Sequence, residues 1–338
     1  MTVQASNLES EHLPEPAGAP EGDLSKLKGK SPTRLAVGRF RRDKLSMISF
    51  VVVVLYVLAA VAAPFLVKFG VLDPTTFHQD LTDASTGGLP IGDFGGISWD
   101  HPLGVEPQTG RDVLSRIWYG LTFSLAIALS ATLIAIIVGA VLGIIAGFTG
   151  GWVDAFIGRA IDLTLSFPST LMLLALSSIG IQLMADILPG KFSDPLPNGA
   201  YVVFVLALFG WPGIARIIRG QVLSVREREF VDAAVLLGAS RRRIYFKEIL
   251  PNLWAPLLVT FTLTMPAYIS AEAALSYLNI GIKPPTPTLG NILRSSINYS
   301  SADFVFFFTP AFLIMIIVVS FNLLGDGLRD ALDPKTNR

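Results

Sequence analysis

The chain has 338 residues, of which 51% are hydrophobic and only 15% are charged, with 26 basic and 26 acidic side chains. Soluble domains carry about 25% charged residues, so this composition argues against an ordinary soluble enzyme. The balanced charge gives no general basic field, which argues against nucleic acid as a partner. The absence of cysteine from the sequence excludes thiol catalysis, thiolate metal sites and disulfide bonds.

The amino-terminal segment 1–44 is rich in Glu, Pro, Ser, Gly and Lys and contains no long apolar run, so we expect a disordered tail. From Leu45 to Val67 almost every residue is apolar. About 20 such residues cross a hydrocarbon core of about 30 Å, so this run predicts a first transmembrane helix. A cleaved signal peptide is the alternative, because Ala60-Val61-Ala62 resembles a cleavage site. The long preceding segment argues against it.

Five further apolar runs predict five more transmembrane helices. They cover about Leu121–Gly147, Ile161–Ala185, Tyr201–Ile218, Trp254–Leu275 and Phe304–Leu324. Six spans place both termini on one side of the membrane, and 20 of the 26 basic residues fall on that side. By the positive-inside rule both termini are cytoplasmic. The predicted fold is an all-α polytopic membrane protein, with a transmembrane domain over 45–338.

Two segments on the predicted outer side are long, at about 68–120 and about 276–303. Pro and Gly punctuate both, so we expect loops with short helices. His78 and His101 share the first loop with several aspartates, but scattered polar groups explain them better than a zinc site, and we predict no metal. The sequence Gly29-Lys30-Ser31 lacks the preceding glycine of a phosphate-binding loop, so we predict no nucleotide site there.

A few residues within the spans stand out. Gly139, Gly143 and Gly147 recur every fourth residue, which lets another helix approach closely. We favour generic helix packing over a specific dimer contact. Acidic residues within spans are candidates for function, and Asp162 and Glu272 lie near span ends. For Glu272, structural pairing and a role in a transport pathway both stay open.

The predicted cytoplasmic loop at about 219–253 is the most informative segment. Its apolar residues Phe230, Ala233, Ala234 and Leu237 share one face of a short helix. Gly238 suits the left-handed position that ends a helix, and Ser240 can cap the next one. Pro251 is compatible with a turn back into the fifth span. The apolar face could lie on lipid headgroups or dock into a groove of a soluble partner, and the residues alone favour neither.

At this loop the sequence resembles a known family. Asp232-Ala233-Ala234, Gly238 and Ile249-Leu250-Pro251 are similar to the EAA loop of membrane subunits of bacterial ABC importers, with Asp232 in place of the usual Glu. The branch that imports peptides or nickel is indicated by three further motifs. They are the outer-loop sequence from His101 to Arg116, the segment from Glu272 to Pro285, and the carboxy-terminal sequence from Asn322 to Asp330.

The resemblance implies a type I ABC importer permease fold and the second, C-type permease of a dipeptide, oligopeptide or nickel importer in the bacterial cytoplasmic membrane. Implied partners are a homologous permease, two ATPase subunits that bind ATP and Mg, an extracytoplasmic binding protein and the lipid bilayer. This chain would bind no cofactor and would not be an enzyme. The implied ATPase-coupling residues are Phe230, Asp232, Ala233, Ala234, Leu237, Gly238, Leu250 and Pro251.

The carboxy-terminal motif supplies a second group of candidate residues, namely Asn322, Gly325, Asp326, Arg329 and Asp330. We interpret its charged members as anchors against the EAA loop or an ATPase, with plain solvation as the alternative. Two other function classes fit the sequence less well. An ion-coupled secondary carrier would need charges deeper in the membrane, and a membrane hydrolase would need a nucleophile or metal cluster that the sequence does not offer.

Overall fold

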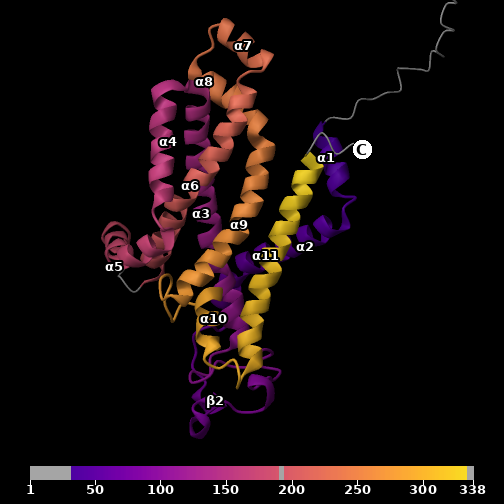
Figure 1. The fold of residues 1–338 in the computed structure, drawn as a ribbon. Helices are drawn as coiled ribbons and strands as arrows, with labels where there is room; N and C mark the ends of the chain where they lie inside the picture. Colours follow the sequence, from indigo (N-terminus) through magenta and orange to yellow (C-terminus); the bar gives the residue numbers. More distant parts are fainter. Residues whose placement is uncertain (1–31, 190–193, 333–338) are drawn as a thin grey trace, which may run out of the picture.

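The computed structural model describes residues 32–189 and 194–332, which form an elongated bundle of long helices (Figure 1). Within these residues six helical segments are long and apolar enough to cross a membrane. This confirms the predicted number of spans. The segments are α2 (Lys44–Lys68), α3 (Val113–Thr149), α5 (Ser169–Ile187), α6 (Pro195–Val225), the run Arg241–Tyr277 that contains α9 (Trp254–Tyr277), and α11 (Phe304–Leu332).

The bundle has two distinct ends, which we call the α7 end and the β2 end. The α7 end carries α7 (Glu229–Leu236) and α8 (Arg241–Arg243), at the top of Figure 1. The β2 end, at the bottom, carries α10 (Leu289–Ile297) and the loop between α2 and α3. That loop holds three 3₁₀ turns and one antiparallel strand pair. They are η2 (Gln79–Leu81), η3 (Ala84–Thr86), η4 (Asp93–Gly95), β1 (Thr82–Asp83) and β2 (Leu89–Pro90).

The amino-terminal segment differs from the expected disordered tail where the structure describes it. Residues Pro32–Phe40 form helix α1, which packs against α11. The ring of Phe40 meets that of Phe50 edge-on at 6.2 Å and lies against the largely buried cluster around α2 and α11. Tertiary contact supplies the burial that local composition lacks. Residues 1–31 of the predicted tail, including Gly29-Lys30-Ser31, lie outside the described residues.

The predicted third span at 161–185 is not one helix. It is divided between α4 (Gly151–Ser166) and α5, and Phe167 between them has an extended backbone with φ −86° and ψ 132°. Pro168 is the cause, because a proline disfavours helical geometry at the residue before it and has no N–H to donate. Of these two helices, only α5 is long and apolar enough to cross a membrane.

Close packing of α3 on α6 forms the centre of the bundle. A Cβ atom on Gly139 or Gly147 would come within 2.8 Å of side-chain carbons of Ile214 or Val222, which is closer than Cβ atoms normally approach. The absence of side chains at these positions therefore sets the distance between the two helices. The recurring glycines therefore serve generic helix packing, as the sequence predicts, and their neighbour is α6 of the same chain.

The fifth span begins differently from the prediction. In place of a turn at Pro251, a nearly continuous helical run connects α8 to α9 through a π-helical segment, η5 (Ile244–Ile249), and a 3₁₀ turn, η6 (Leu250–Leu253). The N–H of Leu250 donates to the carbonyl of Tyr245, five residues earlier. Pro251 sits at the start of the 3₁₀ turn, where its missing N–H is tolerated more readily than in a helix interior.

Candidate functional site: the α7 hairpin and the buried polar groups

The helical hairpin formed by α7 and α8 is closed by a sharp bend at Gly238, whose φ is +74°. The N–H of Gly238 donates to Val235 O at 2.9 Å, and that of Ala239 donates to Ala234 O at 3.0 Å. This pair of bonds is the Schellman motif that ends helices at a left-handed residue. Ser240 then caps α8 by accepting from the N–H of Arg243. Both terminators lie where the sequence placed them.

One face of α7 presents apolar side chains to the surroundings. Phe230 is 41% exposed, and Leu236 and Leu237 are each 87% exposed. Ala233 is exposed as predicted, while Ala234 is half-buried. Leu236 was missed by the sequence analysis, because the exposed side lies opposite the buried Val231 and so includes Leu236, whereas the predicted face included the half-buried Ala234. Such exposed leucines on a structured element are typical of a surface that another molecule covers.

The opposite face of the hairpin is anchored in the bundle. Val231 on α7 is 1% exposed, and it belongs to the same buried cluster as Ile249 and Leu253. The ring of Tyr245 meets that of Phe148 on α3 edge-on at 5.4 Å, and its hydroxyl lies 3.0 Å from the Thr149 hydroxyl. Because apolar packing and hydrogen bonds hold its base, the hairpin is fixed rigidly to α3, α6 and α9.

The other predicted coupling residues lie around this hairpin. Asp232 is exposed on α7 and Pro251 is exposed in η6, whereas Leu250 is half-buried beside the cluster. The structure therefore brings all eight predicted coupling residues into one hairpin and its base.

Charged side chains brace the same end of the bundle. Arg219 on α6 forms two hydrogen bonds to Asp154 on α4, of 2.5 Å from Nε and 2.7 Å from Nη2. The hydrogen bonds from this guanidinium hold the pKa of the Asp154 carboxyl below its usual value. Nη1 of Arg226 donates to the carbonyl of Gly147 at 3.0 Å and so caps the end of α3. These bonds join the ends of three helices.

Glu272 lies in the protein interior. Its side chain is 1% exposed, and its two carboxylate oxygens accept hydrogen bonds of 2.8 Å from the hydroxyls of Ser124 and Ser276. Ser124 in turn accepts from the N–H of Leu289 at the start of α10. Glu272 thus links α3, α9 and α10, and the geometry favours structural pairing over a pathway role.

The carboxy-terminal motif packs α11 against its neighbours. A Cβ on Gly325 would lie 2.7 Å from Oγ1 of Thr262 on α9, and one on Gly327 would collide with Ser46 on α2. Asn322 is half-buried, while Asp326, Arg329 and Asp330 are exposed on the last turns of α11. Figure 1 shows this end of α11 beside α1 and across the bundle from α7. The motif is therefore not brought together with the α7 hairpin.

A buried ion-pair cluster at the β2 end escaped the sequence analysis. Glu106, Arg111 and Arg116 are each at most 6% exposed. Oε2 of Glu106 lies 2.6 Å from Nη2 of Arg111 and 3.3 Å from Nε of Arg116. Nη1 of Arg116 also lies 3.2 Å from the carbonyl oxygen of Pro74 and 3.3 Å from that of Pro285. The cluster ties two loops distant in sequence to the start of α3.

The histidines of the same loop have structural partners. Nδ1 of His101 lies 3.0 Å from Asp112, whose other oxygen caps α3 by accepting from Ser115 N–H at 2.7 Å. The ring of His78 is 5.4 Å from that of His101. Within the described residues, no group of three His, Cys, Asp or Glu side chains could hold a metal ion.

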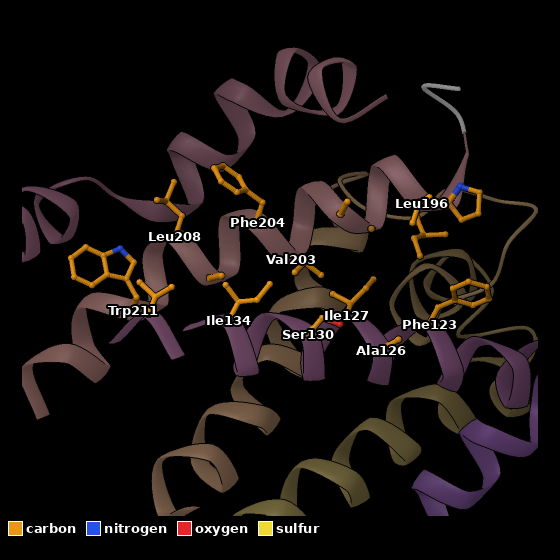
Figure 2. Close-up of a pocket in the computed structure, with 16 residues that line it drawn as sticks. Phe123, Ala126, Ile127, Ser130, Ile134, Leu196, Val203, Phe204, Leu208 and Trp211 are labelled. Atoms are coloured by element: carbon orange, nitrogen blue, oxygen red, sulfur yellow. The ribbon is translucent and has the colours of Figure 1, made fainter. Parts of the chain in front are cut away.

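A cavity of about 710 Å³ lies between α3 and α6 (Figure 2). Figure 2 shows Ile127 and Ile134 of α3 on the side of α6 from which Val203 projects. Among its lining side chains only Ser130 and Trp211 carry polar atoms. The chemistry of this cavity suits hydrocarbon, and it offers no charge to a polar solute.

Comparison with known proteins decides what kind of membrane protein carries this hairpin. Residues 139–338 match the family described as the inner membrane component of binding-protein-dependent transport systems. The chain is a member of this permease family. Residues 31–84 also match the amino-terminal transmembrane domain of oligopeptide transport permease C. The permease is therefore the membrane component of an ABC importer, and it is a multi-pass protein of the inner membrane.

Curated relatives match the permease over nearly its whole length. It is 35% identical to the oligopeptide transport system permease protein OppC of Bacillus subtilis over 96% of this chain and 97% of that protein. It is 34% identical to the dipeptide transport system permease protein DppC of the same organism, over 94% and 90% respectively. The glutathione transport system permease protein GsiD of Salmonella paratyphi A is 35% identical over 90% of this chain and 91% of its own.

A solved structure supports the fold. An inward-facing form of the MetNI methionine ABC transporter has a chain that superposes with a TM-score of 0.50, covering 65% of this permease and 96% of that chain. The sequence identity is 18%, so this likeness concerns the fold alone. The predicted ABC importer permease fold is confirmed. The placement of both termini in the cytoplasm stays a prediction.

Proposed function

We propose that this permease is the C-type membrane subunit of an ABC importer for dipeptides or oligopeptides, and that the α7 hairpin couples it to a separate ATPase. The observation that supports coupling most directly is the pair of nearly fully exposed leucines, Leu236 and Leu237, on a hairpin whose base is buried. An exposed apolar helix end on a rigid base can enter the groove of a partner with little loss of conformational entropy.

In this proposal the α7 end faces the cytoplasm, where two ATPase subunits bind ATP and Mg. Closure of the ATPase pair displaces α7. Since Val231 and Tyr245 fix the hairpin to α3, α6 and α9, the displacement tilts these helices as a unit. The pathway, formed with a homologous permease, then opens toward a binding protein at the β2 end. Such transmission requires a docked element that both sites bias. This chain itself performs no hydrolysis and binds no cofactor.

The proposed cargo follows from the relatives. Proteins named for oligopeptide and dipeptide transport are about one third identical to the permease over nearly the whole chain. Uptake of labelled dialanine in cells that lack the natural gene, with and without the restored permease, measures this directly. If the permease restores uptake of labelled dialanine, and unlabelled dialanine inhibits that uptake while nickel does not, the result supports a peptide importer. Restored nickel uptake without peptide uptake would assign the nickel alternative.

The coupling role is tested at the exposed leucines. The double variant Leu236→Ser and Leu237→Ser removes apolar surface without touching the interior, so we expect normal membrane levels, loss of ATPase co-purification and loss of uptake. Ile91→Ser is the matched control, because Ile91 is 58% exposed at the opposite end. Unchanged uptake by the double variant would contradict the coupling role and favour a helix that lies on lipid.

Gly238→Val tests the bend itself. No atom lies within 4 Å of the Cβ position, so its effect arises from the φ of +74° and not from a clash. We expect the hairpin to deform and uptake to fall while the spans still insert. Gly220→Val on α6 also meets open space but lies in ordinary helical geometry, and we expect it to retain uptake.

A further inference from the structure

The polar cavity at the β2 end differs from the apolar cavity of Figure 2. It measures about 520 Å³ and is lined by residues that bear a cation, amides, a hydroxyl and an aromatic ring. The lining residues are Tyr277, Pro284, Asn291, Arg294, Ser295, Ile297 and Asn298. The volume lies in the range of small-molecule sites, and convergent polar groups beside apolar ones are typical of such sites.

The wall of this cavity is rigid. Thr288 and Asn291 form a reciprocal capping box at the start of α10. Nδ2 of Asn291, a residue only 6% exposed, donates to the carbonyls of Ile282 at 3.1 Å and Thr286 at 2.9 Å. Gly290 packs where a Cβ would come within 2.7 Å of Ala273 on α9. The side chains that follow on α10 are therefore presented from a fixed backbone.

Arg294 gives the cavity its charge. It is exposed, and its Nη1 donates to Oδ1 of Asn279 at 2.5 Å, a neutral partner. Within the described residues no carboxylate oxygen lies within 4 Å of its guanidinium nitrogens. A guanidinium presents several donors in a planar fork that fits a carboxylate, and Asn279 occupies only part of it.

We infer that this cavity is a subsite for the carboxylate of a translocated peptide, with Arg294 as the carboxylate-binding residue. Tyr277 and Ile297, 54% and 38% exposed, supply apolar surface beside the cation for the rest of the ligand. Ser295 and Asn298 supply further hydrogen-bonding groups. This inference rests on the proposed function, because it takes the cargo to be a peptide. It assigns to the permease a share of cargo selection.

The test compares labelled dialanine with labelled dialanine amide, which lacks the free carboxylate, at saturating levels of the full importer's binding protein. In Arg294→Gln we expect uptake of dialanine to fall about tenfold relative to the natural chain while uptake of the amide is unchanged. Arg294→Lys keeps the charge and should retain part of the preference. Lys68→Gln, which removes an exposed cation from the end of α2, should leave both rates as they are.

The outcomes separate this inference from the function on which it rests. Discrimination by the binding protein is common to all variants, so only the change in the ratio between the two substrates concerns Arg294. An equal fall for both substrates, or no fall for either, overturns the subsite. If the natural chain restores uptake of neither peptide, the proposed cargo fails, and the subsite fails with it.

Discussion

The two ends of the bundle differ in which kinds of side chain they expose and which they bury. At the α7 end, Leu236 and Leu237 are left exposed, while the base of the hairpin is held by close helix packing. At the β2 end, Glu106, Arg111 and Arg116 are buried together, and they fasten loops to the start of α3. Exposed apolar side chains indicate a surface that another molecule covers. A buried ion-pair cluster indicates a region whose segments are fixed in one arrangement.

The largest expected effect is at the β2 cluster. Glu106→Gln removes the only acidic member of the cluster and leaves two buried guanidinium groups uncompensated. Breaking a buried pair in this way costs about 3–5 kcal/mol of the free energy of unfolding. Thermal unfolding of the detergent-solubilised protein measures the change. A loss below about 1 kcal/mol would mean that these charges are solvated, as exposed pairs are, and would erase the contrast between the two ends.

A smaller loss is expected where packing holds the α7 end. In Gly147→Val the new side chain would meet Val222 and the carbonyl of Arg219, because a Cβ there already comes within 3.0 Å of both residues. Overpacking of this kind costs about 1–3 kcal/mol. Gly220→Val, which meets nothing within 4 Å, is the control in the same unfolding assay. Equal losses in the two variants would show that helix propensity alone accounts for the effect.

A buried carboxyl at the β2 end should make the stability of the protein depend on pH. Asp303 is 3% exposed, its Oδ1 accepts from Phe306 N–H at 3.0 Å, and burial raises the pKa of its carboxyl. Because the folded state then binds the proton more tightly than the unfolded state, stability falls as pH rises from the ordinary carboxyl pKa through the raised one. Asp303→Asn should be more stable than the natural chain at neutral pH and should lack this decline. Parallel stability profiles for the two proteins would refute the assignment.

The smallest effect on stability is expected at an exposed ion pair, which can be compared with the buried cluster around Glu106. Arg216 and Asp162 form a 3.0 Å ion pair whose side chains are 59% and 63% exposed. An exposed pair contributes between about 0 and 1 kcal/mol, so Asp162→Asn should change the unfolding free energy by no more than that. Measured beside Glu106→Gln, it compares the same kind of interaction in two surroundings. A loss as large as that of Glu106→Gln would show that exposure does not decide the value of an ion pair here.

Local signals predicted a large part of this permease. The apolar runs gave six spans because the length of hydrocarbon to be crossed is fixed. Gly238 and Ser240 marked the bend of the hairpin because capping depends on a few adjacent residues. One local signal was passed over. Pro168 divides the predicted third span, and the residue type alone was sufficient to show it.

Other features depended on segments far apart in the chain. The motif from Gly110 to Arg116 was visible as a family signature, but its role as a clamp on Pro74 and Pro285 required the folded loops. The predicted apolar face of α7 differs from the exposed one at two residues, because Leu236 is exposed and Ala234 is half-buried. The side of α7 that is covered depends on the buried cluster that contains Ile244 and Ile249, which the sequence does not show. Glu272 was a candidate for a pathway until Ser124 and Ser276 were seen to enclose it.

By itself, the sequence determined how many times the chain can cross a membrane, where its exposed hairpin bends, and to which family the motifs belong. Apolar length, backbone stereochemistry and motif spacing are properties of short segments, so they can be read without a fold. Only the tertiary structure decided which charges are buried, which leucines remain exposed, and that Arg294 lines a polar cavity. These depend on the approach of distant segments, because burial and electrostatic pairing are set by neighbours in space.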